Sequence, residues 1–192
     1  MKDTLILLRE FARRPSEVGA IVPSSSYLTT EIVRQAGVRN ANVIVEFGPG
    51  TGSFTREILR QKKENAIFFG IEANGSLVKT LRRKFPQANI IAGSAENTLS
   101  ILKKDNQSEA DCIVSGLPWA AFPPSLQDKL LEAAIASLRP GGRFTTFAYL
   151  HGLMLPAGRR FRQKMRETFS KVHLGRIIWK NIPPAFVYRC IK

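Results

Sequence analysis

Three glycines at alternate positions directly follow a short apolar run and precede a helical pattern: Gly48, Gly50 and Gly52. At such a junction the backbone can approach a ligand closely, and its N–H groups point outward. Glu72 ends the next apolar run, 22 residues after Gly50, where a carboxylate can bind both hydroxyls of a ribose. Ser53 stands where a dinucleotide site would have glycine or alanine. The spacing therefore predicts a ribose-containing ligand at a strand–loop–helix junction.

A second group of side chains with chemical potential lies further along the chain. Ser115-Gly116-Leu117-Pro118-Trp119 follows an apolar run, and Trp119 offers a ring that can stack on a nucleobase or face an alkylammonium. Tyr149 and His151 come just after another apolar run and are, by position, candidates for accepting a proton. No Cys–His or metal-ligand spacing accompanies them, so neither nucleophilic nor metal chemistry is predicted.

The elements that must position these residues alternate between strands and helices. Strands that are apolar throughout, separated by helices, indicate a parallel sheet covered on both faces. The last two strands leave no room for a crossover helix and are therefore predicted to be antiparallel neighbours. The predicted strands are 43–45, 66–71, 89–92, 111–114, 143–148, 177–179 and 186–188. The predicted helices are 4–14, one ending near Gln35 and closed by Gly37, one bearing Phe54 and Ile58, 77–85, 127–138, and a segment with the stripe Phe161, Met165 and Phe169.

Length and composition exclude several classes of protein. The chain has 192 residues, of which 44% are hydrophobic and 23% charged, as expected of one folded domain rather than a disordered chain. No apolar run approaches the roughly 20 residues of a membrane-spanning helix, and no secretory signal opens the chain. Two cysteines, Cys112 and Cys190, and two histidines do not suggest a zinc site or a disulfide framework. A cytoplasmic protein without a metal is expected.

Basic residues are concentrated in the last third of the chain. Residues 133–192 contain 12 Lys and Arg against one acidic residue, Glu167, so they carry +11 of the total net charge of +14. Part of this charge follows the Phe161 stripe, as Arg159, Arg160, Arg162, Lys164 and Arg166. A charge segregated in this way indicates an anionic partner, either a phospholipid surface or nucleic acid. Solubility alone would not require the segregation.

Residues 43–55, VIVEFGPGTGSFT, resemble the first motif of class I S-adenosylmethionine-dependent methyltransferases. Leu138-Arg139-Pro140-Gly141-Gly142 resembles the turn before their fifth strand. The resemblance implies an α/β Rossmann-like fold whose seven-stranded, mostly parallel sheet has the order 3-2-1-4-5-7-6 and an antiparallel last strand. It also implies S-adenosylmethionine as cofactor, with S-adenosylhomocysteine as product.

The same resemblance implies a role for individual residues. Glu46 and the glycine loop would face the methionine portion of the cofactor, and Glu72 would hold the ribose hydroxyls. Ser94 and Ala95 would meet the adenine edge, with Glu96 as an alternative contact. Ser115 and Gly116 would lie beside the sulfonium. In amino-directed nucleic-acid methyltransferases the position of Gly116 carries Asn or Asp, so this chain lacks one acceptor for an exocyclic amine.

Four blocks of sequence resemble the bacterial phosphatidylethanolamine N-methyltransferases that are soluble and associate with membranes. They are Arg13-Arg14-Pro15, residues 18–25, Ser115-Gly116-Leu117-Pro118 and residues 181–189. This resemblance implies that Ser24, Ser25, Leu117, Pro118, Trp119 and Tyr149 lie near the lipid substrate. Tyr149 matches a tyrosine often present just past the fifth strand in that family, whereas residues 151–156 depart from the family's pattern. The catalytic candidates are Trp119, as a stacking or cation–π partner, and Tyr149 and His151, by position alone.

Residues 1–39 are expected to form a lid or a membrane and substrate segment, and residues 40–192 the cofactor-binding core. Leu5, Leu8 and Ala12 share one helical face, with Lys2 and Arg9 supplying charge, which is typical of a short interfacial helix. The protein is therefore predicted to act at the inner face of the membrane as a peripheral phospholipid N-methyltransferase. No obligate protein partner is evident from the sequence.

Three alternatives remain open. A ribosomal RNA adenine N-methyltransferase would share the glycine loop and use the basic surface to bind phosphates. A small-molecule amine methyltransferase would need the same cofactor motif. A binding module that keeps the fold without catalysis would bind a membrane or nucleic acid, and it would not bind the cofactor.

Overall fold

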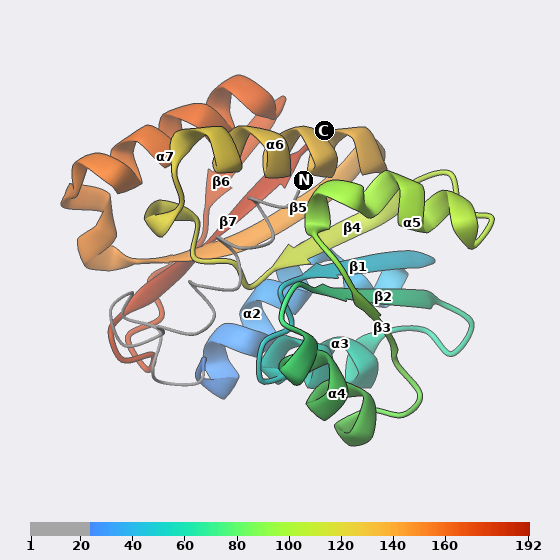
Figure 1. Cartoon of the computed structure of the whole chain (residues 1–192). Helices are drawn as coiled ribbons and strands as arrows, with labels where there is room; N and C mark the ends of the chain where they lie inside the picture. Colours follow the sequence, from blue (N-terminus) through green and yellow to red (C-terminus); the bar gives the residue numbers. More distant parts are fainter. Residues whose placement is uncertain (1–23) are drawn as a thin grey trace.

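A seven-stranded sheet with helices on both faces forms the described part of the chain, residues 24–192 of a computed structural model (Figure 1). The strand order is β3-β2-β1-β4-β5-β7-β6, as the family resemblance implies. The first five strands pair in parallel, and β7 is antiparallel to both β5 and β6. The strands are β1 (Val43–Phe47), β2 (Ile67–Glu72), β3 (Asn89–Ala92), β4 (Ala110–Ser115), β5 (Leu138–Tyr149), β6 (Lys171–Leu174) and β7 (Ala185–Ile191).

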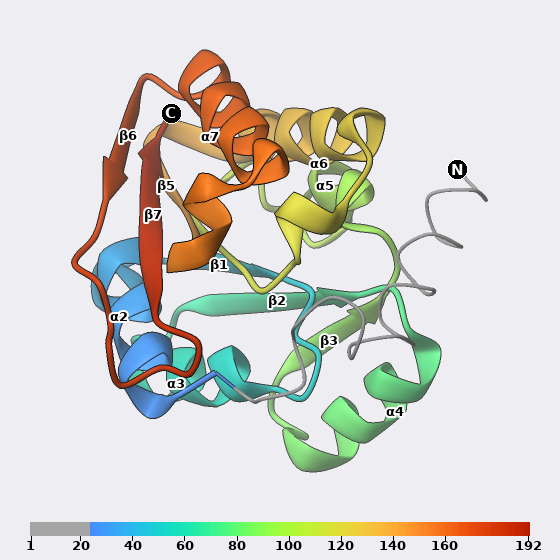
Figure 2. The same cartoon turned by 90° about the vertical axis from the view of Figure 1, so that its left-hand side faces the viewer.

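The helices fall into two layers, because alternate residues of each buried strand face opposite sides of the sheet. Val43 and Val45 pack with α5, α6 and α7, whereas Ile44 packs with α2, α3 and α4 (Figures 1 and 2). The α-helices are α2 (Ser26–Ala36), α3 (Ser53–Gln61), α4 (Gly75–Lys84), α5 (Thr98–Lys104), α6 (Pro124–Ser137) and α7 (Pro156–Thr168). Short 3-10 turns are η1 (Val38–Asn40), η2 (Ala95–Asn97), η3 (Trp119–Ala121) and η4 (Leu150–Met154).

The stripe predicted from the four-residue spacing in α7 is confirmed. Phe161, Met165 and Phe169 are buried. The ring of Phe161 is 6.3 Å from that of Tyr188 on β7, and the ring of Phe169 stacks on Phe144 of β5 at 5.3 Å. The stripe therefore fixes α7 on the sheet. Of the basic residues between its members, Arg166 is exposed, whereas Arg162 and Lys164 are half-buried.

One predicted strand is wrong. The apolar run Ile177-Ile178-Trp179 is not β6, which lies earlier at Lys171–Leu174. Within that run only Ile178 touches the sheet, through an isolated bridge to Ala185. The observed β6 is an edge strand with a single half-buried apolar contact, Val172, so its sequence lacks the continuous apolar character of the buried strands.

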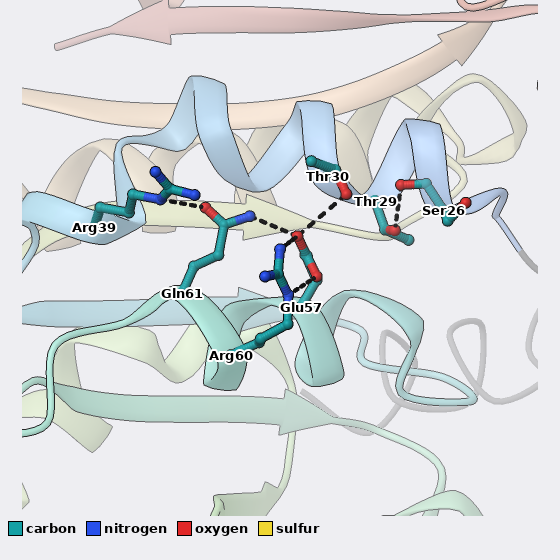
Figure 3. A network of polar contacts seen from close by, with 7 residues as sticks. All are labelled: Ser26, Thr29, Thr30, Arg39, Glu57, Arg60 and Gln61. Carbon is teal, nitrogen blue, oxygen red and sulfur yellow. Dashed lines mark hydrogen bonds and ion pairs between the residues drawn. The ribbon is translucent and has the colours of Figure 1, made fainter.

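A polar network joins α2 and η1 to α3 (Figure 3). Glu57 of α3 accepts a hydrogen bond from the Thr30 hydroxyl at 3.2 Å and forms a two-point contact with Arg60 at 2.6 and 2.8 Å. Gln61 links the same carboxylate to Arg39. The hydrogen bonds from Arg60, Gln61 and Thr30 outweigh partial burial and lower the pKa of Glu57 to about 2. The network thereby fixes α2 beside the helix that follows the glycine loop.

Candidate functional site

Four parallel strands end at one edge of the sheet, which we call the carboxyl edge. Phe47 of β1 pairs with Ile71 of β2 and with Ser115 of β4, and Ser115 pairs with Thr146 of β5. The residues that follow these positions must therefore lie side by side. They are the glycine loop, Glu72, Gly116 and Tyr149.

The glycine loop at this edge needs glycine for two different reasons. Gly50 has φ +58° and no atom nearer than 3.9 Å to the place of a β-carbon, so its outer side is open. Gly52 has φ +84°, and a β-carbon there would stand 2.4 Å from the Phe85 ring. Gly50 therefore keeps space for a ligand, whereas Gly52 lets α3 pack closely against α4 and the residue that follows it.

Glu72 holds the loop from the end of β2. One carboxylate oxygen accepts a hydrogen bond from the Gly50 N–H at 3.0 Å, and the other accepts from the Asn74 N–H at 2.9 Å. Burial raises the pKa of this carboxyl, and the backbone hydrogen bonds oppose that effect. A backbone hydrogen bond from Ala73 also contributes to lowering the pKa. Since a carboxylate has about four acceptor sites, Glu72 can still receive a ligand hydroxyl without releasing the loop.

Glu46, near the end of β1, is completely buried. Its Oε2 accepts a hydrogen bond from the Thr55 hydroxyl at 2.7 Å, while Oε1 has no partner. Burial raises the pKa of Glu46 to about 8; the Thr55 hydrogen bonds oppose the rise and the charge of Glu72 adds to it. Thr55, in the first turn of α3, belongs to the motif of residues 43–55, but the sequence analysis assigned it no role. An unpartnered buried oxygen beside the glycine loop is an available acceptor for a ligand cation or N–H group.

The segment after β3 brings Ser94 and Ala95 to the same edge. Both are buried, and the Ser94 hydroxyl caps η2 by accepting from the Glu96 N–H at 3.3 Å. One oxygen of Glu96, Oε1, is buried without a partner. An adenine contact at Ser94 and Ala95 stays a prediction, and Glu96 is the side chain with a free acceptor there.

Gly116 follows β4 and packs directly on the glycine loop. Its N–H donates to the Phe47 carbonyl at 2.9 Å, and a β-carbon on it would stand 2.9 Å from the Gly48 carbonyl oxygen. The half-buried side chain of Leu117 closes over Gly48 from the other side. Pro118 is half-buried and leads into η3. Residues 116–118 therefore pack against the glycine loop, and none of them projects a polar side chain from it.

The structure corrects the interpretation of Trp119. This residue is 2% exposed. Its ring stacks on Phe161 at 5.2 Å, and its Nε1 donates to the Ser115 hydroxyl at 2.9 Å. No ring face is open to a nucleobase or an alkylammonium. Trp119 is a core residue that fixes the loop after β4. Its Nε1–H also uses the Ser115 hydroxyl oxygen as its hydrogen-bond acceptor.

Tyr149 and His151 do come together. Their rings are parallel within 7° at 5.7 Å, and the Tyr149 ring also meets Phe147 edge to face. Phe147 in turn contacts Phe54 of α3, which lies beside Gly116. The sequence analysis placed Phe54 on a helix face without assigning it to the site. Burial raises the pKa of the half-buried Tyr149 phenol.

Ser25 has a structural role in α2, and its expected contact with a lipid stays a prediction. Its hydroxyl caps α2 by accepting from the Leu28 N–H at 3.2 Å, and its N–H donates to the buried Asn181 side chain at 3.0 Å. Ser24 is half-buried, and its substrate contact stays a prediction. The parts of the two terminal sequence blocks that the structure describes therefore meet in space. Residues 1–23, including the predicted interfacial helix, lie outside the described residues.

Residues 44–142 match the protein family described as a methyltransferase domain. The chain belongs to this family. It is an S-adenosylmethionine-dependent methyltransferase of class I, as the glycine-loop motif and the strand order predicted. The methyltransferase is 30% identical to the ornithine lipid N-methyltransferase of Singulisphaera acidiphila, over 99% of this chain and 96% of that protein. It is 29% identical to a ribosomal RNA small subunit methyltransferase of Arabidopsis thaliana, over 59% of this chain and 31% of that protein.

Solved structures of methyltransferases share the fold. An O-methyltransferase from Bacillus cereus in complex with SAH superposes with a TM-score of 0.69 at 15% identity, covering 99% of this chain and 91% of that one. The O-methyltransferase TomG from Streptomyces achromogenes, in complex with SAM, gives a TM-score of 0.68 at 16% identity, with coverage of 96% of this chain and 89% of that one.

Within residues 24–192, no three metal-ligating side chains lie close enough together to hold a metal ion.

Proposed function

We propose that this methyltransferase methylates the primary amine of a membrane lipid headgroup, of the phosphatidylethanolamine or ornithine-lipid kind. Similarity along almost the whole chain to an ornithine lipid N-methyltransferase supports an aminolipid acceptor. Gly116 favours a lipid over RNA as the methyl acceptor. A β-carbon added at this position would lie 2.9 Å from the Gly48 carbonyl oxygen. The Asn or Asp that amino-directed nucleic-acid methyltransferases carry there would displace the glycine loop.

The residues at the carboxyl edge fit the cofactor. When bound, S-adenosylmethionine supplies an electrophilic methyl group on a positively charged sulfur. Glu72, which keeps acceptor capacity beside its backbone hydrogen bonds, would hold the ribose hydroxyls, and the open side of Gly50 would face the ligand. Glu46, with its unpartnered Oε1, would face the cationic methionine portion. Since the reaction needs an in-line approach and exclusion of water, positioning by these groups accounts for most of the catalysis.

An aliphatic amine must lose a proton before it can react. With a reference pKa near 10.4, exposing the free amine at pH 7 costs about 4–5 kcal/mol. Burial raises the pKa of Tyr149 and keeps its phenol protonated, so Tyr149 would accept an amine N–H as a neutral hydroxyl oxygen. His151 is exposed and stacked on the Tyr149 ring, so it is the group that would pass the proton to water.

The proposed place of action is the inner membrane face, which the enzyme would reach as a peripheral protein. No helix within residues 24–192 is long and apolar enough to cross a bilayer. The +11 charge of residues 133–192 favours an anionic surface. Binding to such a surface would bring the carboxyl edge to the lipid amines, and the lipid would remain in the bilayer.

The test supplies the purified full chain with labelled methyl donor and three acceptors in separate reactions. These are vesicles of phosphatidylethanolamine with phosphatidylglycerol, vesicles of ornithine lipid with phosphatidylglycerol, and ribosomal RNA. We expect label in one or both lipid fractions, at a rate that rises with pH as more amine is deprotonated. Gly50→Val, whose side chain would be strained at φ +58° and fill the open space, is the inactive control. Label in RNA and none in lipid, from protein of unchanged thermal stability, would overturn the proposal.

A further inference from the structure

A groove outside the glycine-loop site lies between α2 and residues 173–180. Figure 2 shows the backbone of the segment between β6 and β7 beside α2. Its volume is about 970 Å³, at the upper end of what ligand sites usually offer. Tyr27, Glu31, Arg34 and Gln35 line one side from a single face of α2. The segment between β6 and β7, with Arg189 of β7, lines the other side.

The groove carries an excess of positive charge. Glu31 is its one acidic side chain, and Arg34 neutralises it through hydrogen bonds of 2.7 and 2.9 Å. Arg176, Lys180 and Arg189 form no direct ion pair with an acidic side chain of residues 24–192, although the charge of Arg176 helps to lower the pKa of Glu31. The Nε of Arg189 is buried and has no hydrogen-bond partner. A donor of this kind beside two further cations fits a phosphate or carboxylate group.

Large apolar side chains line the same groove and remain exposed. Trp179 is 67% exposed, and Tyr27, Ile177 and Leu174 are also exposed. The Lys180 amine lies 4.6 Å from the centre of the Tyr27 ring and donates to its hydroxyl. Aromatic and aliphatic groups mixed with cations match the boundary between lipid headgroups and acyl chains.

One end of the groove adjoins the carboxyl edge. Asn181 follows Lys180 and accepts from the N–H of Ser25 at the start of α2. Pro184 accepts from the Leu150 N–H, immediately after Tyr149. Two strongly exposed apolar residues, Ile182 and Met154, belong to the segments that this contact joins. A surface resting on the groove would therefore also face the proposed reaction site.

The basic side chains of α7 are not combined with exposed apolar side chains of the same helix in the way that those of the groove are. Lys164 is paired with Asp128, which corrects its expected place in a free basic face. Arg162 is half-buried and its Nε, like that of Arg189, is buried without a partner. Arg159, Arg160 and Arg166 are exposed, but the apolar stripe of α7 is buried in the core. This helix presents a solvated cationic face, whereas the groove presents cations and exposed apolar groups together.

We propose that the groove binds the headgroup of an anionic membrane lipid, with Arg176, Lys180 and Arg189 holding the anionic group and Trp179 inserted beside it. This surface would hold the enzyme on the bilayer, and it is distinct from the site that binds the lipid to be methylated. The inference rests on the proposed action at a membrane, but it concerns the docking surface and not the identity of the methyl acceptor.

The experiment compares binding of the full chain to phosphatidylcholine vesicles with and without phosphatidylglycerol. The groove variant is Arg176→Gln with Lys180→Gln, and the control is Arg159→Gln with Arg160→Gln, which removes equal charge from α7. We expect the groove variant to weaken binding to phosphatidylglycerol vesicles about tenfold or more, and the control less than threefold. Trp179→Ala should weaken binding to the same vesicles without any change in charge.

Several results would overturn the inference. Equal losses in the groove variant and the α7 control would mean that net charge alone attracts the membrane. Unchanged binding in both the charge variant and Trp179→Ala would remove the groove from the interface. Loss of ribosomal RNA binding with vesicle binding retained would assign the groove to nucleic acid. Because vesicle binding is measured without methyl donor, a failure of the proposed function would be seen separately, as wild-type protein that binds vesicles and methylates no lipid.

Discussion

At the scale of single residues, Glu46 is the most unusual group in the site. A buried carboxyl with a pKa of about 8 is protonated at neutral pH, whereas the cationic end of the cofactor would favour its ionised form. Binding should therefore release a proton. The same raised pKa makes the stability of the fold depend on pH. The raised pKa stabilises the fold below the ordinary carboxyl pKa of 4.5, and this contribution is lost as pH rises through about 8.

The first prediction concerns this proton. Affinity of the wild type for S-adenosylmethionine should rise from pH 6 to pH 9, with proton release seen as a buffer-dependent heat in calorimetry. Glu46→Gln should flatten the pH dependence and lower the affinity at pH 9. The same variant should be more stable to denaturant than the wild type at pH 9, with the difference shrinking toward pH 5. A wild-type affinity that does not change with pH would contradict the role of Glu46.

A second prediction separates the two tasks of Glu72. Glu72→Ala should weaken cofactor binding by about 1–3 kcal/mol, since charge-assisted hydrogen bonds are lost. Glu72→Gln keeps one carbonyl oxygen to accept from the Gly50 N–H, so it should preserve more of the loop and lose less affinity. The exposed Glu64, at the turn before β2, provides the control Glu64→Gln. Equal affinities for all four proteins in titration calorimetry would remove Glu72 from the cofactor site.

At the scale of elements, the close approach of the loop after β4 to the glycine loop determines what position 116 can hold. Gly116→Asn should lower the melting temperature and weaken cofactor binding, because its β-carbon meets the backbone oxygen of Gly48 at 2.9 Å. Gly75→Asn is the matched control, since nothing lies within 4 Å of that β-carbon position. A stable Gly116→Asn variant that gains activity on an exposed adenine would favour the RNA alternative instead.

The network between α2 and α3 yields a fourth prediction. Glu57→Gln should destabilise the fold by about 1 kcal/mol at pH 7, a value reduced for solvent screening. The lowered pKa means that this carboxylate stabilises the fold above pH 4.5 and that the contribution is lost as pH falls through about 2. Denaturant unfolding at pH 7, 4 and 3 should therefore show a narrowing difference between variant and wild type. Glu132→Gln, at an exposed position of α6, should show no such trend.

Elements differed in how well the sequence predicted them. The buried strands β1, β2 and β4 were located because each is apolar throughout, and Gly37 does close α2 with φ +78°. The seven-residue helix α5 was not predicted, since two turns carry too little periodicity. Local spacing predicted that the glycine loop and Glu72 lie together, and the hydrogen bond from Gly50 to Glu72 confirms this. Spacing did not predict the burial of Trp119, because its neighbour Phe161 comes from a helix 42 residues later in the sequence.

At the scale of the whole molecule, charge and topology act together. The C-terminal 60 residues contribute β5, β6, β7 and α7, and with them the groove cations Arg176, Lys180 and Arg189. The chain order places β6 and β7 at one end of the sheet, so most of the net charge gathers at that end. A bilayer attracted there would meet both the groove and the end of the carboxyl edge that holds Tyr149.

The last prediction combines this surface with residues 1–14, for which the sequence predicts an interfacial helix. If both contact one bilayer, each raises the effective concentration of the other. Deleting residues 1–14 and introducing Arg176→Gln with Lys180→Gln should each weaken binding to phosphatidylglycerol vesicles, and the combined protein should lose roughly the product of the two factors. Salt should release the wild type, since charges are screened within about 8–10 Å at physiological ionic strength. Melting temperature and cofactor affinity serve as controls for the fold. A deletion that leaves vesicle binding unchanged would restrict residues 1–14 to a lid over the reaction site.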